Sequence, residues 1–177
     1  MVPSAPQRRF IPVFPAILCT IAATTGAVAV SAARAADALT KGGAGTVAEV
    51  VDGDTVSLAS GDRIRLVGLQ APKLPLGRAN FEKWPLADDA RKALSDMVLG
   101  KVVALSYGGR RVDRYRRLLA HLHLPGGRWV QGEMLRLGLA RVYSFSDNRA
   151  LVARMYVLER AARQARRGIW AHPFYAI

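Results

Sequence analysis

The sequence predicts an α+β fold in which a small β-barrel is accompanied by about three helices. Two apolar runs, 56–58 and 64–69, flank the turn residues 60–62 and are typical of a β-hairpin. A helical pattern at 90–98 separates this hairpin from further strand-like runs, and two more helical patterns lie toward the C-terminus. Short strands, one intervening helix and closing helices favour an OB-fold-type five-stranded β-barrel.

The first 35 residues have the layout of an export signal peptide. Arg8 and Arg9 precede an uncharged run at 10–33, and small residues at 33 and 35 predict cleavage near Ala35. The run is also long enough to cross a membrane, so an N-terminal membrane anchor is the alternative. Its two prolines make a poor spanning helix. We therefore expect an exported protein, periplasmic or secreted.

The remaining 142 residues are strongly basic. Residues 1–35 contain three of the 26 basic residues and none of the 13 acidic ones, which leaves a formal net charge of +10. This charge predicts nucleic acid or another polyanion as the partner. Because the one cysteine lies before residue 36, disulfides and thiolate metal sites are excluded from this part. We expect a monomer without a stable membrane span.

Local patterns divide this part into a flexible lead-in at 36–45, one domain at 46–172 and a C-terminal tail at 173–177. A first strand is expected at 46–51, followed by the hairpin. The long surface loop after Lys73 should end at an N-cap on Asp88 or Asp89, and Gly100 should end the helix at 90–98.

The second half of the domain alternates strands with helices. Strands are expected at 102–107, 118–124 and 140–145, and a short helix at 130–137 should end at Gly138. Asp147 is the expected cap of a last helix. The apolar face of that helix comprises Leu151, Met155, Leu158 and Ala162. These elements complete the predicted barrel and its helices.

Two charged residues of the hairpin point toward its apolar side. Asp54 shares its alternation with the apolar residues of 56–58, and Arg65 shares its alternation with those of 67–69. A charge on the buried side is costly unless it meets a partner, a metal or a phosphate. An ordinary turn and a surface arginine are the alternative reading. Further along, the segment 108–117 carries five arginines and one aspartate, which indicates a basic surface.

An ordered set of short motifs resembles the staphylococcal nuclease-like (thermonuclease) family. The motifs are DGDT at 52–55, RLVGLQAP at 65–72, DRYRR at 113–117, GLARVY at 138–143 and GIW at 168–170. The resemblance extends over 46–170. It implies the same barrel fold and the calcium-dependent hydrolysis of phosphodiester bonds in DNA and RNA.

The resemblance also implies roles for individual residues. Arg65 and Arg117 match the two arginines that hold the phosphate and stabilise its charge, so both are candidate catalytic residues. Tyr115 matches an aromatic residue beside the bound nucleotide. Asp54 matches the first metal carboxylate. Arg114 and Arg116 extend the expected phosphate-binding surface around these residues.

Two positions of the catalytic site depart from the family pattern. Where the family has Asp-Thr-Pro-Glu, this chain has Gln70-Ala71-Pro72-Lys73. Gln70 replaces the second metal carboxylate, although its amide oxygen and the carbonyl of Ala71 are still candidate metal ligands. Lys73 replaces the general base, and a protonated lysine cannot accept a proton from water.

These departures leave two functions open. One is a weak or altered nuclease whose binding of calcium is weak or absent, since calcium affinity follows the charge of its ligands. Glu82 is then the nearest substitute base in the sequence. The other is a non-catalytic module that binds nucleic acid or another polyanion on a nuclease fold.

Overall fold

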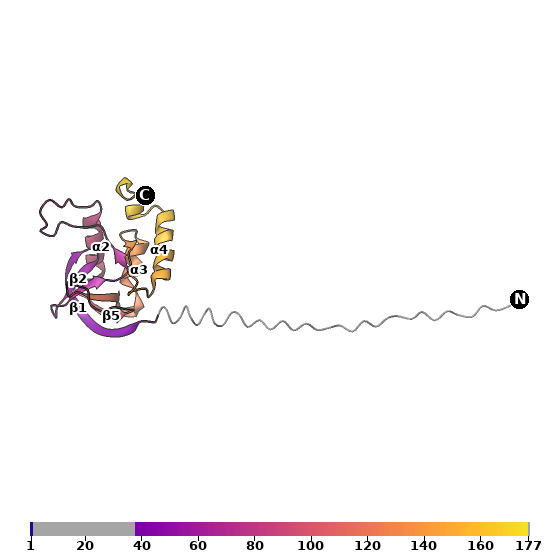
Figure 1. The fold of residues 1–177 in the computed structure, drawn as a ribbon, viewed down its shortest axis with the longest axis horizontal. Coiled ribbons are helices and arrows are strands. Elements are labelled where there is room, and N and C mark those ends of the chain that lie inside the picture. The colour runs from indigo at the N-terminus through magenta and orange to yellow at the C-terminus, as the bar shows by residue number, and fades with distance from the viewer. Residues whose placement is uncertain (2–37, 177) are drawn as a thin grey trace.

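Five strands close into a barrel in the order β1-β2-β3-β6-β5. The computed structural model describes Met1 and residues 38–176, so the expected signal peptide at 1–35 lies outside the described residues except for Met1. Figure 1 shows the strands of the barrel together with the helices α2, α3 and α4. Within the described residues, the predicted α+β fold of a five-stranded barrel with about three helices is therefore confirmed.

Strand β1 (Thr40–Asp52) takes part in both halves of the barrel. Its first half pairs with β5 (Val102–Tyr107), and its second half pairs with β2 (Thr55–Leu58). Irregularities in both registers allow the strand to bend from one half to the other. The strand begins six residues before the predicted one. Most of the expected lead-in is therefore paired strand.

The predicted hairpin is the second structural unit of the barrel. Strand β2 pairs antiparallel with β3 (Arg63–Leu66), and β3 pairs in parallel with β6 (Leu118–His123) to close the barrel. A separate two-stranded sheet joins β4 (Leu69–Gln70) to β7 (Arg141–Val142). This pairing brings segments about 70 positions apart together beside the end of the hairpin.

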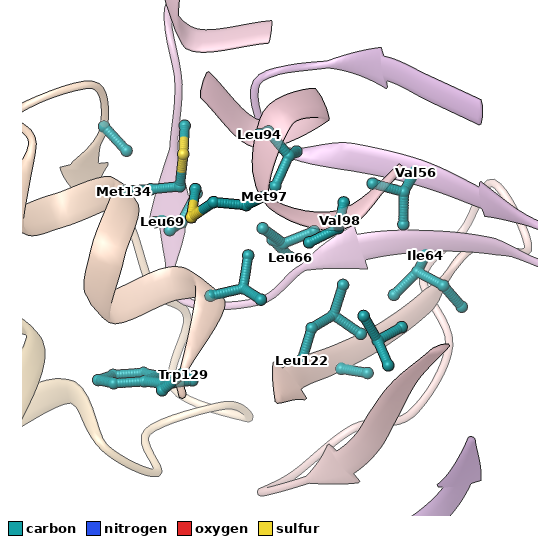
Figure 2. Packing of buried hydrophobic residues seen from close by; sticks show 14 of the residues in the cluster. Val56, Ile64, Leu66, Leu69, Leu94, Met97, Val98, Leu122, Trp129 and Met134 are labelled. Atoms are coloured by element: carbon teal, nitrogen blue, oxygen red, sulfur yellow. The ribbon is translucent and has the colours of Figure 1, made fainter. Parts of the chain in front are cut away.

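Apolar side chains fill the space between the barrel and the helices (Figure 2). Helix α2 (Ala87–Val98) contacts β1, while α3 (Val130–Arg136) contacts α2, β6 and α4 (Val152–Gln164). Ile64, Leu66 and Leu122 of the barrel and Leu94 and Met134 of the helices are fully buried. This core fixes the end of the hairpin against α2 and α3.

Both predicted aspartate caps are wrong. The residues that precede α2 and α4 are Leu86 and Leu151, each with a left-handed backbone (φ 62° and φ 60°). Asp88 and Asp89 lie inside the first turn of α2, where acidic side chains interact favourably with the positive end of the helix dipole. Tertiary packing of the apolar residues sets where these helices begin, in preference to the local capping signal.

The C-terminal segment also has structure of its own. Short 3₁₀-helices follow α4 at η2 (Gly168–Ala171) and η3 (Pro173–Tyr175), in addition to η1 (Pro125–Gly127) after β6. Part of the expected tail packs on the long loop, since Phe174 contacts Trp84 with ring centroids 5.8 Å apart. Within the described residues, no helix is long and apolar enough to span a membrane.

Candidate functional site

A pocket of about 810 Å³ opens beside the end of the hairpin. Three segments line it: the hairpin end at 65–73, the basic segment at 110–119 and the loop at 143–148. The candidate residues that line the pocket are Arg65, Gln70, Lys73, Arg114, Tyr115 and Arg117. Arg116 does not line it and lies in the turn of the basic segment with a left-handed backbone (φ 63°).

Asp54 lies at the turn between β1 and β2 and is fully buried. The turn packs closely against Ala71 and Ala90, and only a glycine fits at position 53. A Cβ there would come within 2.7 Å of the Cβ atoms of both alanines. The backbone N–H of Asp54 donates to Asp52 Oδ1 at 3.0 Å, which holds the turn. The alternation in the sequence therefore placed Asp54 on the correct side.

The Asp54 carboxylate is surrounded by donors of the chain itself. Its Oδ2 lies 2.8 Å from Lys73 Nζ and 3.3 Å from Arg65 Nη2, and it accepts the backbone N–H of Ala71 at 2.8 Å. Its Oδ1 accepts the hydroxyl of Thr55 at 3.2 Å. Burial raises the pKa of Asp54, but the charges of Arg65 and Lys73 outweigh it and hold the pKa below 3.8.

Arg65 is held in place by carbonyl groups of the hairpin as well as by Asp54. Its Nη1 donates to the carbonyl of Leu66 at 2.8 Å and its Nη2 to that of Leu69 at 2.8 Å. Ile64 and Leu66 on either side are fully buried in the barrel, so the alternation of β3 directs Arg65 to the pocket face. The guanidinium is thus fixed at the pocket wall, with 12% of its side chain exposed.

Gln70 is also bound to a cation. Its Oε1 accepts from both Nε and Nη2 of Arg141, at 3.1 Å and 2.7 Å. The pairing of β4 with β7 creates this contact, because Gln70 and Arg141 are register partners. Arg141 was not among the residues that the sequence singled out, and no local signal connects it to Gln70.

The residues at the expected calcium position do not fit a calcium ion. Calcium requires six to eight oxygen ligands with enough negative charge. The Asp54 carboxylate accepts from Lys73, the Gln70 amide accepts from Arg141, and the observed contact of Ala71 is through its N–H. In the part of the chain that the structure describes, no group of three His, Cys, Asp or Glu side chains could hold a metal.

Asp113 organises the basic segment. Its Oδ1 accepts the backbone N–H groups of Tyr115 and Arg117 at 2.8 Å and 2.9 Å. Its Oδ2 lies 2.8 Å from both Nε and Nη2 of Arg117. Burial raises the pKa of Asp113, but the hydrogen bonds and charge of Arg117 outweigh it and lower the pKa. The guanidiniums of Arg114 and Arg117 lie over the Tyr115 ring, at 4.8 Å and 5.4 Å.

The loop at 143–148 contributes pocket residues that sequence reasoning missed. Tyr143 and Phe145 are exposed and meet edge to face, with ring centroids 5.2 Å apart. Tyr115 is also exposed on the wall formed by the basic segment, so aromatic rings lie on two walls of the pocket. Tyr143, the last residue of the GLARVY motif, and Phe145 two positions later are the aromatic residues that could have indicated this wall from the sequence.

The pocket contains no carboxylate at the position of the family's general base. Glu82 is exposed and does not line the pocket. The acidic lining residues are Asp113, bound to Arg117, and Asp147, whose Oδ2 lies 3.7 Å from Arg110 Nη1. Both carboxylates therefore face an arginine.

Comparisons with known proteins identify the family of this chain. The family model described as staphylococcal nuclease homologue matches residues 63–172. An uncharacterized endonuclease of Escherichia coli O157:H7 is 35% identical over 130 residues, which cover 72% of this chain and 76% of that protein. Endonuclease YncB of Bacillus subtilis (strain 168) is 29% identical over 135 residues, covering 73% of this chain and 63% of that protein. The micrococcal nuclease of Shigella flexneri is 31% identical over 140 residues, covering 73% and 74%. The expected family is thereby confirmed: this chain belongs to the staphylococcal nuclease family.

Proposed function

We propose that this protein binds nucleic acid through the pocket and hydrolyses its phosphodiester bonds slowly. The observation that carries the proposal is the meeting of Arg65, Arg117, Lys73 and Tyr115 at one pocket of about 810 Å³. The cations suit the phosphate groups, and the exposed aromatic ring suits the bases. The nuclease relatives support the same class of ligand.

Slow hydrolysis follows from the residues at positions 70 and 73. A general base typically contributes about 10² to 10⁴ in rate, and Lys73 cannot supply one while its ammonium lies against Asp54. Both acidic residues of the pocket wall face arginines. Arg65 and Arg117 are therefore proposed to hold the phosphate while the attacking water lacks a fixed base. Export of the mature chain after cleavage near Ala35 is part of the same proposal.

Single-turnover cleavage of single-stranded DNA tests this function. The double variant Gln70→Asp with Lys73→Glu restores both carboxylates and should cleave at least about 10² faster than the wild type in calcium. Each single change should achieve much less, because metal and base act on the same water. Arg117→Ala is the control for contaminating nuclease. A wild-type rate that the double variant does not improve would show that another base is at work.

One contact favours a second candidate function, a binding module without turnover. The Lys73 ammonium lies 2.8 Å from the Asp54 carboxylate and neutralises its charge without a metal ion. A site that only binds its ligand needs no metal, so this pair suits a binding module. The same assay separates the two functions. Wild-type cleavage no faster than that of Arg117→Ala, together with retained DNA binding, identifies the module.

A further inference from the structure

The Lys73 ammonium lies against the carboxylate of Asp54, which the family resemblance assigns to a metal ion. Its Nζ is 2.8 Å from the fully buried Asp54 carboxylate, and its side chain is 20% exposed and lines the pocket. Lysine therefore reaches from the buried carboxylate to the pocket surface, as a bound cation would.

Gln70, the second expected metal ligand, is also occupied by a cation of the chain. The Gln70 amide oxygen is taken by two nitrogens of Arg141. Each of the two side chains that would hold a metal is thus bound to a cation of the chain. A divalent ion would have to displace an ammonium and a guanidinium to reach them.

The net charge of the residues matched to the family's metal, base and phosphate positions, together with Asp113, changes sign because of these substitutions. Asp54, Asp113, Arg65, Arg117 and Lys73 together carry two negative and three positive charges. With carboxylates at positions 70 and 73, as in the family pattern, these five positions and position 70 would together carry a net charge of −2. A site of that kind repels phosphate until a metal binds, whereas the site in this chain attracts phosphate directly.

The Lys73 ammonium also has N–H groups that are not used in its contact with Asp54. An ammonium carries three N–H groups, and in the described part of the chain the one hydrogen bond of Lys73 Nζ goes to Asp54. Its remaining N–H groups are on a side chain that lines the pocket beside Arg65. They are available to a phosphate oxygen that enters the pocket.

We propose that Lys73 serves as a built-in cation, which neutralises Asp54 and binds a phosphate oxygen of single-stranded nucleic acid, so that binding needs no metal ion. This inference rests on the proposed nucleic-acid function and specifies how the phosphate is held. It predicts affinity that chelators do not change and that depends on the charge at position 73.

The first test measures the affinity of a fluorescently labelled single-stranded DNA by anisotropy, at fixed ionic strength, in EDTA and in calcium. The wild type should bind with the same affinity in both, within about twofold. Lys73→Met should weaken binding by roughly tenfold, the worth of one charge-assisted hydrogen bond. Lys73→Arg should retain metal-free binding, because it keeps a cation at this position.

Lys92→Met is the matched control. Lys92 is also paired with a carboxylate, Asp96 at 2.7 Å, but it lies on α2 with 74% of its side chain exposed and does not line the pocket. Its removal should change the affinity by less than about twofold, since exposed ion pairs contribute little. An equal loss in Lys92→Met and Lys73→Met would overturn the proposal, because net charge alone would then explain the affinity.

The second test uses the calcium ion alone and follows thermal unfolding without nucleic acid. Its decisive result comes from the wild type, so it does not depend on whether a variant folds. The Tm of the wild type should not rise with calcium beyond the change in sodium chloride of equal ionic strength. The double variant Gln70→Asp with Lys73→Glu should gain a calcium-dependent rise. A saturable calcium-dependent rise in the wild type would overturn the proposal.

The outcomes also separate this inference from the proposed function. A wild type that binds DNA only with calcium refutes the built-in cation and leaves the nucleic-acid function standing. A wild type that binds no DNA in either condition refutes the function. In that case the calcium test still decides whether Lys73 excludes the metal.

Discussion

Asp113 controls both the shape of the basic segment and the charge that Arg117 presents. The Asp113→Asn variant keeps an oxygen for the backbone N–H groups of Tyr115 and Arg117, but it removes the charge that faces the Arg117 guanidinium. The Asp113→Ala variant removes the oxygen that accepts the backbone N–H groups as well as the charge. Comparing the two variants therefore separates the contribution of the backbone hydrogen bonds from that of the ion pair with Arg117.

The stability change follows from these contacts. Asp113→Asn should lower the free energy of unfolding by about 1 kcal/mol, because 27% of the Arg117 side chain is exposed and solvent screens the pair. Asp113→Ala should cost about 2–4 kcal/mol, because two backbone hydrogen bonds of about 0.5–1.5 kcal/mol each are also lost. Urea denaturation at pH 7 measures both values.

The pH dependence of the same pair has a definite sign. The folded-state pKa of Asp113 lies below 3.8, so its stabilisation is fully present above that pH. It is lost as the pH falls through the folded-state pKa. The stability difference between the wild type and Asp113→Asn should therefore shrink below pH 3.8.

Binding should change in the opposite direction from stability. In Asp113→Asn the Arg117 charge is no longer neutralised, so single-stranded DNA should bind more tightly at low salt. The slope of log K against log salt should become steeper by about 0.7, the value for one more phosphate neutralised on a single strand. Asp96→Asn, which breaks an exposed pair on α2, is the control and should leave the slope unchanged. Weaker binding with an unchanged slope would refute the reasoning.

Two further predictions concern the barrel and the C-terminal segment. Burial, and to a lesser extent the charge of His123, lowers the pKa of His121 to about 4. Because the unfolded state then binds the proton more readily, stability should fall by about 3 kcal/mol between pH 7.5 and pH 4. The free energy of unfolding of His121→Leu, measured by urea denaturation, should not show this loss. Parallel pH profiles of unfolding free energy in the variant and the wild type would contradict the prediction. Tyr175→Phe removes the hydroxyl that donates to the carbonyl of Pro85 at 2.6 Å. It should cost about 1 kcal/mol and speed hydrogen exchange in the loop at 74–86, and unchanged exchange would show that this contact does not hold the loop.

Local periodicity was sufficient for the strands of the hairpin and for the burial of Asp54, but not for the direction of Arg65. In β3, Ile64 and Leu66 face the barrel core, so Arg65 lies on the opposite, pocket face and not on the apolar side that its alternation with 67–69 predicted. The alternation of 56–58, in contrast, correctly predicted the burial of Asp54. This succeeded because neighbouring side chains of a strand must point to opposite faces, whatever the rest of the fold does. The ordered motifs added the family, which the comparisons confirm.

Contacts between distant segments were decided by the tertiary structure alone. Lys73 reaches Asp54 across 19 positions of the sequence, and Arg141 reaches Gln70 across 71. Neither pair has a local signature, since barrel closure and the pairing of β4 with β7 create both. The sequence shows that a lysine and a glutamine replace two carboxylates. Only the fold shows that each of the two expected metal-ligand side chains is already bound to a cation, because the packing of the whole chain sets these distances.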